Sequence, residues 1–234
     1  MDKELFIEEI KKLGIDITND KIDKLDKFYN ILIEWNNRIN LTGITDKKEV
    51  YLKHFYDSLT LIKSVDLSKN ISLCDVGSGA GFPGIVLKIF FPNLKITLID
   101  SLNKRVNYLN NLITELGLED IEAIHARMED YSRLNEEKFD LVTARAVGSV
   151  KLLSEISVRA LKINGILCFM KGNLNEEIIN IDNCLKELNL EIISIDKFQL
   201  PIENSNRSII KIIKRKKTLN KYPRSVDKIK KEPL

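Results

Sequence analysis

The chain has 234 residues, of which 44% are hydrophobic and 30% are charged, and its formal net charge is +3. These values are ordinary for a globular protein that is long enough to fold alone. No apolar run approaches the ~20 residues that span a membrane, and residues 1–30 are charged throughout, so we expect neither a membrane segment nor a signal peptide.

The cysteines and the ends of the chain narrow the class of protein further. Cys74, Cys168 and Cys184 lie in apolar runs without the spacing of a metal site. We therefore expect reduced core cysteines, no bound metal and a cytoplasmic protein, which we take to be a monomer. Residues 211–231 hold ten Lys or Arg and one acid, Asp227, so this segment carries +9 and the rest of the chain −6. A basic tail on an acidic body indicates an anionic partner, although a solvated, frayed terminus is an equally open alternative.

The first 65 residues have the periodicity of amphipathic helices. Apolar stripes over residues 5–13 and 22–35 predict two helices. Residues 36–42 are too rich in asparagine to continue the second one, because asparagine competes for hydrogen bonds with its own backbone. Asp46 with Glu49 resembles a capping box and predicts a third helix.

From residue 71 the pattern changes to alternating strands and helices. Strands are expected at 71–76, 95–100, 121–125, 139–144, 165–171, 190–199 and 207–214, and helices at 83–91, 102–117, 149–161 and 174–188. This alternation predicts right-handed βαβ units and a parallel sheet with helices on both faces. Only a short polar loop joins the last two strands, which must therefore pair as an antiparallel hairpin at the edge of the sheet.

A glycine-rich turn interrupts the pattern between the first of these strands and the helix that follows it. Gly77, Gly79 and Gly81 follow an apolar strand directly, and Pro83 precedes the helix. Such a turn places backbone N–H groups at a helix N-terminus, where a ligand can come close. Three possibilities are open at this point: a dinucleotide, S-adenosylmethionine, or a turn without a ligand.

Two acids favour S-adenosylmethionine. The segment Gly79–Gly84 matches G-x-G-x-x-G, but Asp75 stands two residues before the first glycine, where a carboxylate would repel a pyrophosphate. The same carboxylate suits the cationic end of S-adenosylmethionine. Asp100 ends the second strand, where a carboxylate can accept both ribose hydroxyls of an adenosine. The predicted closing hairpin also resembles the Rossmann-like methyltransferase fold.

Several motifs together resemble one family, the bacterial small-subunit ribosomal RNA (guanine-N7) methyltransferase G, also called glucose-inhibited division protein B. The matching stretches cover nearly the whole chain and are Trp35–Asn36, Asn40–Thr42, His54–Leu59, Asp75–Gly84, Asp100–Arg105, Arg127–Glu129, Thr143–Ala146, Tyr222–Arg224 and Pro233–Leu234. The resemblance implies a Rossmann-like class I methyltransferase fold, an α/β domain at 67–214 whose seven-stranded, mostly parallel sheet has an antiparallel last strand. An N-terminal helical extension at 1–66 and a basic C-terminal tail at 215–234 flank this domain.

The resemblance also implies which residues hold the cofactor. It assigns cofactor contacts to Gly77, Phe82, Met128, Glu129 and Arg145. The reasoning from the turn and from the second strand adds Gly79 and Asp100. Arg145 ends an apolar strand at the carboxyl edge of the sheet, so it could hold either the cofactor or the target base.

The implied reaction is methyl transfer from S-adenosylmethionine to N7 of a guanine in 16S ribosomal RNA. N7 carries a lone pair and no proton, so no general base is needed and no catalytic residue is predicted. Of the two histidines, His125 is interpreted as structural, whereas core packing and RNA contact are both open for His54.

Lys171, Arg207 and Arg224 are the candidates for RNA contact, together with the basic tail and residues 36–42. The sequence departs from the family pattern after Arg224, which leaves open whether the tail docks on the body. A non-enzymatic RNA-binding or ribosome-assembly factor, and a methyltransferase for a protein or a small molecule, remain as alternatives. The sequence does not choose between naked RNA and the assembled small subunit as partner.

Overall fold

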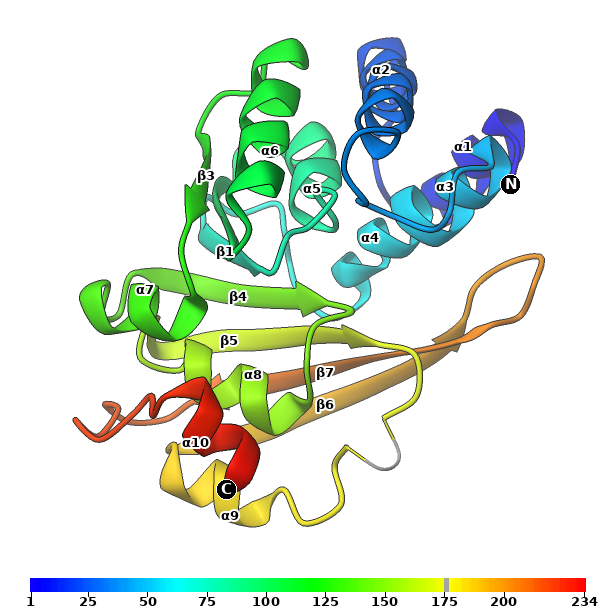
Figure 1. Ribbon diagram of the computed structural model, residues 1–234. Helices are drawn as coiled ribbons and strands as arrows, with labels where there is room; N and C mark the ends of the chain where they lie inside the picture. The colour runs from blue at the N-terminus through cyan, green and yellow to red at the C-terminus, as the bar shows by residue number, and fades with distance from the viewer. Residues whose placement is uncertain (175–176) are drawn as a thin grey trace.

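The computed structural model describes residues 1–174 and 177–234. Its centre is a seven-stranded sheet with the order β3-β2-β1-β4-β5-β7-β6 (Figure 1). The strands are β1 (Ser72–Val76), β2 (Lys95–Asp100), β3 (Ile121–His125), β4 (Phe139–Arg145), β5 (Leu161–Lys171), β6 (Leu190–Gln199) and β7 (Asn206–Lys214). Strands β1 to β5 pair in parallel, and β7 runs antiparallel to both of its neighbours. The predicted fold, with its reversed last strand and edge hairpin, is confirmed.

Helices cover both faces of this sheet. On one face lie α5 (Gly84–Phe90) and α6 (Asn103–Glu115), over which α2 (Asn19–Asn36) packs. The other face carries α7 (Met128–Leu134), α8 (Val150–Ser157), α9 (Asp182–Glu187) and α10 (Val226–Lys231) (Figure 1). Near α2 lie the N-terminal helix α1 (Lys3–Lys12) and α3 (Lys47–Val50).

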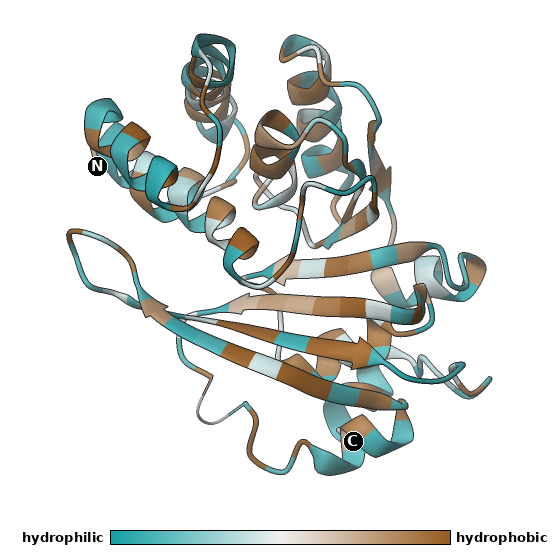
Figure 2. Ribbon diagram, turned by 180° about the vertical axis from the view of Figure 1, so that it is seen from behind, coloured by the Kyte–Doolittle hydropathy of each residue, from teal (hydrophilic) through white to brown (hydrophobic). Residues whose placement is uncertain are grey.

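Successive side chains of each strand point to opposite faces of the sheet, and this produces two separate apolar cores. In β1, Leu73 belongs to the core shared with the N-terminal helices, while Cys74 belongs to the core beneath α8. In β4, Leu141 and Val142 divide in the same way, as expected for a strand that is buried on both faces. Figure 2 shows apolar residues concentrated along the central strands and alternating with polar residues on the N-terminal helices.

The Asn-rich segment after α2 turns back toward the sheet. The α2 helix ends at Asn36, as its composition predicts. The side-chain Oδ1 of Asn36 then accepts hydrogen bonds from the backbone N–H groups of Leu41 and Thr42, at 2.9 and 3.0 Å. This side chain therefore fixes the course of residues 36–42.

The predicted third helix is present but is not a regular α-helix. Asp46 caps α3 by accepting a hydrogen bond from the Glu49 N–H at 3.0 Å. The chain then forms a π-helix, η1 (Tyr51–Tyr56), followed by one turn of α-helix, α4 (Asp57–Leu59), and the 3₁₀ helix η2 (Thr60–Lys63). A π-helical turn widens the helix locally and is often found at functional sites.

Two predicted boundaries differ for reasons of backbone conformation. Strand β5 begins at Leu161 instead of residue 165. The turn expected at Asn164, which has a φ of +64°, lies within the strand. The pairing of β4 with β5 shifts its register there. The helix expected at 174–188 is reduced to α9, since Asn180 has a φ of +58°. Residues 175–176 of that expectation lie outside the described residues.

The C-terminal tail docks on the body, which answers the question left by its sequence. At the end of β7, Lys214 bonds the carbonyl oxygen of Leu161, the first residue of β5, so the tail begins at the amino end of the parallel strands. Tyr222 is buried and its hydroxyl donates to Glu187 at 2.7 Å. Helix α10 then packs near α8 (Figure 1). In the part of the chain that the structure describes, no helix is long and apolar enough to cross a membrane.

Candidate functional site

The glycine turn after β1 has a backbone that other residues would distort. Gly77 and Gly79 have φ values of +68° and +57°. A Cβ on Gly77 would lie 2.6 Å from Cγ2 of Val147, so a side chain there would collide with the loop after β4. The turn is held from β2, because the N–H of Gly77 donates to the carbonyl oxygen of Ile99 at 2.7 Å.

A cavity of 270 Å³ lies against this turn. Four of the predicted cofactor residues, Gly77, Gly79, Phe82 and Arg145, line it. The N-terminal extension contributes to the same cavity through Leu41, Thr42 and His54, and the remaining lining residues are Ser78, Ala80, Arg105, Ala146 and Val147. The extension is therefore part of the site and not a separate appendage.

The other three predicted cofactor residues do not line this cavity. Asp100 is buried, and its two carboxylate oxygens accept hydrogen bonds from the N–H groups of Gly79 and Leu102, both at 2.9 Å. Met128 and Glu129 are buried at the start of α7, two residues after Ala126, whose N–H donates to the carbonyl oxygen of Asp100. Asp100 thus supports the glycine turn directly, and the other two residues lie farther along the same sheet edge.

Asp75 lies beneath the turn and is fully buried. Its Oδ2 accepts a hydrogen bond from the Gly84 N–H at 2.9 Å, whereas its Oδ1 has no partner among the described residues. Burial raises the pKa of this carboxyl group to about 6, against the lowering effect of the Gly84 hydrogen bond. A cation arriving near the turn would stabilise the ionised form.

Phe82 forms the apolar wall of the cavity. Its ring stacks on the ring of His54 with 4.4 Å between centroids, and on Phe28 with 5.2 Å. The guanidinium carbon of Arg145 lies 5.2 Å from the Phe82 ring centroid. An aromatic face and a cation thus meet at the same point.

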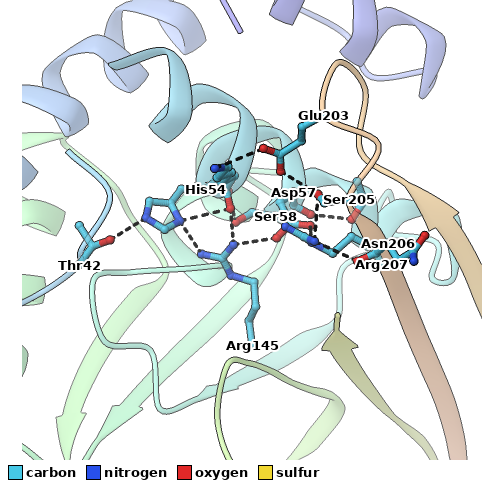
Figure 3. A network of polar contacts seen from close by, with 11 residues as sticks. Thr42, His54, Asp57, Ser58, Arg145, Glu203, Ser205, Asn206 and Arg207 are labelled. Carbon is cyan, nitrogen blue, oxygen red and sulfur yellow. Dashed lines mark hydrogen bonds and ion pairs between the residues drawn. The ribbon is translucent and has the colours of Figure 1, made fainter. Parts of the chain in front are cut away.

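A polar network joins the N-terminal extension to the sheet edge (Figure 3). Arg145 donates to the carbonyl oxygen of Lys53 at 2.7 Å and to Oδ2 of Asp57 at 2.9 Å. The other carboxylate oxygen of Asp57 accepts from Nε of Arg207 at 3.0 Å. One carboxylate, 6% exposed, therefore holds one arginine from β4 and one from β7.

The same network engages both ring nitrogens of His54. Nδ1 of His54 lies 3.1 Å from Nη2 of Arg145, which is a donor, and 3.2 Å from the carbonyl oxygen of Lys53, which is an acceptor. Nε2 lies 2.9 Å from the hydroxyl oxygen of Thr42, within hydrogen-bond distance. Burial, and secondarily the charge of Arg145, lower the pKa of His54 to about 3, so the ring is neutral near pH 7.

A second cavity, of 530 Å³, adjoins the first. The two share His54, Arg145, Ala146 and Val147, which form the wall between them. Lys171 and Arg207, two of the predicted RNA contacts, line the second cavity. A third cavity, of 340 Å³, continues the second one along the β6–β7 hairpin.

The third predicted RNA contact, Arg224, has a different position. Its Nε and Nη2 each donate to a carboxylate oxygen of Glu155 at 2.7 Å, and Glu155 is buried in α8. Arg224 therefore anchors the tail through an intramolecular ion pair, and its contact with RNA stays a prediction. The tail also begins at the sheet edge opposite the cavities, so it does not extend their basic surface. His125 is exposed, with Nε2 3.1 Å from the carbonyl oxygen of Ser101.

Sequence reasoning missed Asp57 as a site residue and included Thr42 only within residues 36–42, which were expected to contact RNA. Both lie in motifs that carry the family resemblance, but nothing local shows that Asp57 would meet Arg145, 88 positions away in the chain. The described residues contain no group of three His, Cys, Asp or Glu that could hold a metal ion. All three cysteines are buried and unpaired.

The strand order, the reversed seventh strand and the glycine turn after β1 together define the Rossmann-like class I methyltransferase fold. A SAM-dependent methyltransferase from Aquifex aeolicus has this fold, with a TM-score of 0.52, 20% identity and coverage of 72% of this chain and 94% of that chain. A 16S rRNA adenine-N1 methyltransferase from Catenulisporales acidiphilia matches with a TM-score of 0.52 and 12% identity, over 65% of this chain and 88% of the other. These two similarities concern the fold alone.

The sequence comparisons identify the family. The family model for rRNA small subunit methyltransferase G matches residues 21–204. Proteins named Ribosomal RNA small subunit methyltransferase G from a Geobacillus species (strain WCH70) and from Oceanobacillus iheyensis are 44% and 43% identical to this chain over 237 residues, with 100% of each chain covered. The chain belongs to the rRNA small subunit methyltransferase G family.

Proposed function

We propose that this protein transfers the methyl group of S-adenosylmethionine to N7 of a guanine in small-subunit ribosomal RNA, acting as a cytoplasmic monomer. The observation that carries the proposal is the pair of adjoining cavities. One is lined by the glycine turn of a methyltransferase fold, and the other opens beside it across the wall of His54, Arg145, Ala146 and Val147. Ribosomal RNA is proposed as the methyl acceptor because the relatives of this chain are named Ribosomal RNA small subunit methyltransferase G.

The residues around the first cavity fit this cofactor. The unpartnered Oδ1 of Asp75, buried beneath the turn, would favour a cation in the cavity, and Gly77 lines that cavity with bare backbone. Phe82 offers an aromatic face, and Arg145 a cation for a carboxylate. When bound, S-adenosylmethionine supplies an electrophilic methyl group on a sulfonium.

The protein's own contribution to such a reaction is alignment. Guanine N7 needs no deprotonation, and His54, with its lowered pKa and both ring nitrogens engaged, is unsuited to act as a general base. His54 and Arg145, which line both cavities, would instead hold the cofactor on one side and the base on the other. Holding two reactants in line can supply ~7–11 kcal/mol of the barrier reduction.

Tritiated methyl transfer to 16S RNA, either naked or in small subunits, tests the proposal. Borohydride and aniline cleavage would then map N7-methylguanine in the product. We expect Arg145→Ala to reduce transfer by roughly 100-fold or more, the range seen when one preorganised charged donor is removed. Arg215→Ala is the control, because Arg215 pairs with Glu191 on β6 at the opposite edge and lines neither cavity.

A protein that binds 16S RNA but transfers no methyl group would instead be the assembly factor considered as the alternative. Methylation of a protein or of a small molecule in place of RNA would support the other alternative. Wild-type activity in the folded Arg145→Ala protein would remove Arg145 from the site.

A further inference from the structure

An ion pair lines the second cavity and has no part in the wall that the two cavities share. Lys171, at the end of β5, places Nζ 2.9 Å from Oε2 of Glu177 and 3.2 Å from Oε1. Its Nζ also donates to the carbonyl oxygen of Gly148. Oε2 of Glu177 accepts from the N–H of Val150 at 2.9 Å, at the start of α8. Backbone groups on both sides therefore fix the pair in place.

Both members of the pair retain capacity for a ligand. An ammonium group has three N–H donors: Gly148 takes one, and the two oxygens of Glu177, at 2.9 and 3.2 Å, are within reach of the others, so a ligand acceptor would take the donor that now makes the longer contact. Oε1 of Glu177 receives only the longer contact from Lys171, and the Glu177 side chain is 28% exposed. The pair thus presents a donor and an acceptor side by side to the cavity.

This polarity matches one purine. Along its Watson–Crick edge guanine presents the O6 acceptor followed by the N1–H and N2–H₂ donors. Adenine presents an amino donor at the position of O6 and an acceptor at N1. Its donor would therefore face the Lys171 donor, and its acceptor would face the Glu177 acceptor. Sites that hydrogen-bond a substrate group reject the analogue that lacks it, because their own polar groups are then left unpaired.

The remaining surface of the cavity suits the faces of a base. Met170, Phe198 and Ile209 line it, and unpaired RNA bases are commonly held between apolar or aromatic side chains. A cavity built only for phosphate would offer arginine and lysine without the carboxylate of Glu177.

We propose that the Lys171–Glu177 pair reads the target guanine, with Lys171 donating to O6 and Glu177 accepting from N1–H and N2–H₂. N7, on the other side of O6, then faces the shared wall of the two cavities. This inference rests on the proposed function and adds the residues that select the base. Lys171 keeps its predicted place in RNA recognition but contacts the base instead of the phosphate backbone.

Measuring each of two enzyme variants with each of two RNA substrates tests this assignment. RNA carrying guanosine or inosine at the methylated position is offered to the wild type and to Glu177→Gln. Inosine keeps O6, N1–H and N7 and lacks only the 2-amino group. We expect the wild type to prefer guanosine by roughly 10- to 100-fold in kcat/KM, the effect of one hydrogen bond to a charged group. In Glu177→Gln this preference should fall to within about threefold.

The matched control is Glu191→Gln, which alters an exposed acid of β6 and should keep the wild-type preference. Cofactor affinity should be unchanged in Glu177→Gln, because Glu177 does not line the cofactor cavity. Equal losses with guanosine and inosine would show that Glu177 only ties its loop to α8, and would overturn the assignment.

A binding measurement separates this inference from the proposed function. Fluorescence anisotropy would compare a uridine nonamer carrying one central guanosine or inosine, in the presence of S-adenosylhomocysteine. Tighter binding of guanosine by the wild type, lost in Glu177→Gln, supports the pair even if no methyl group is transferred. Equal affinity of the wild type for both oligonucleotides refutes it, even if guanine is methylated.

Discussion

The buried carboxyl group of Asp75 makes the stability of the protein depend on pH in an unusual direction. Burial raises its pKa from the ordinary value of 3.8 to about 6. Between these two values the folded protein holds a proton that the unfolded chain has released. Stability contributed by the neutral acid is therefore present below pH 3.8 and is lost as pH rises toward 6. Well above pH 6 the free energy of unfolding has fallen by ~3 kcal/mol in total. This is about 1.36 kcal/mol for each pH unit between the two pKa values.

Asp75→Asn removes this titration and keeps the shape of the side chain. The amide oxygen can still accept the hydrogen bond from the Gly84 N–H. Urea denaturation of both proteins at intervals from pH 4 to pH 8 gives the free energy of unfolding of each. We expect the value for the wild type, minus that for the variant, to fall by about 2 kcal/mol between pH 4 and pH 7 and then to remain level, because part of the total loss of ~3 kcal/mol occurs below pH 4.

Asp66→Asn is the control with the opposite sign. Asp66 is exposed, and hydrogen bonds from Ser68 lower its pKa, so its contribution is present at neutral pH and is lost as pH falls. A wild-type minus Asp75→Asn difference that stays flat, or rises with pH, would refute the reasoning about Asp75.

Three further predictions concern the site and the tail. Asp57→Asn should lower the free energy of unfolding by about 3 kcal/mol, because two half-buried guanidinium groups lose their counter-ion, and thermal melting should show a fall of ~6–12 °C. Gly77→Ala should weaken S-adenosylhomocysteine binding in calorimetry far more than Gly79→Ala, whose Cβ would meet nothing closer than 3.7 Å; equal effects would contradict the steric argument. Arg224→Met should cost about 3 kcal/mol in urea denaturation and leave the salt dependence of RNA binding unchanged, whereas Arg215→Met, which breaks an exposed pair, should cost less than about 1 kcal/mol.

Local signals in the sequence were enough to predict the sheet and the position of the cofactor turn. Strands buried on both faces read as short apolar runs, and glycine is the residue type that a turn with positive φ requires. The position of Arg145 at the carboxyl edge followed from the end of its own strand. Each of these predictions depends on residues that are neighbours in the chain.

The features that were missed depend on tertiary contacts. The pairing of Asp57 with Arg145 and Arg207 joins three distant segments. Arg224 looked like part of a solvated basic tail, because its partner Glu155 lies 69 positions earlier in α8. The bend at Asn164 resembled the end of an element, and only pairing with β4 shows that β5 continues through it.

The place of β7 in the sheet has a consequence for synthesis of the protein. It is the last strand of the described residues, yet it lies between β5 and β6, so within the described sheet β6 pairs with β7 alone. While the chain is being translated, β5 keeps an open edge and β6 stays unpaired until residues 206–214 have emerged from the ribosome. Unpaired strand edges of this kind are templates for aggregation. Nascent chains that stall or terminate before Asn206 are therefore expected to depend on chaperones, although they already contain the whole glycine turn.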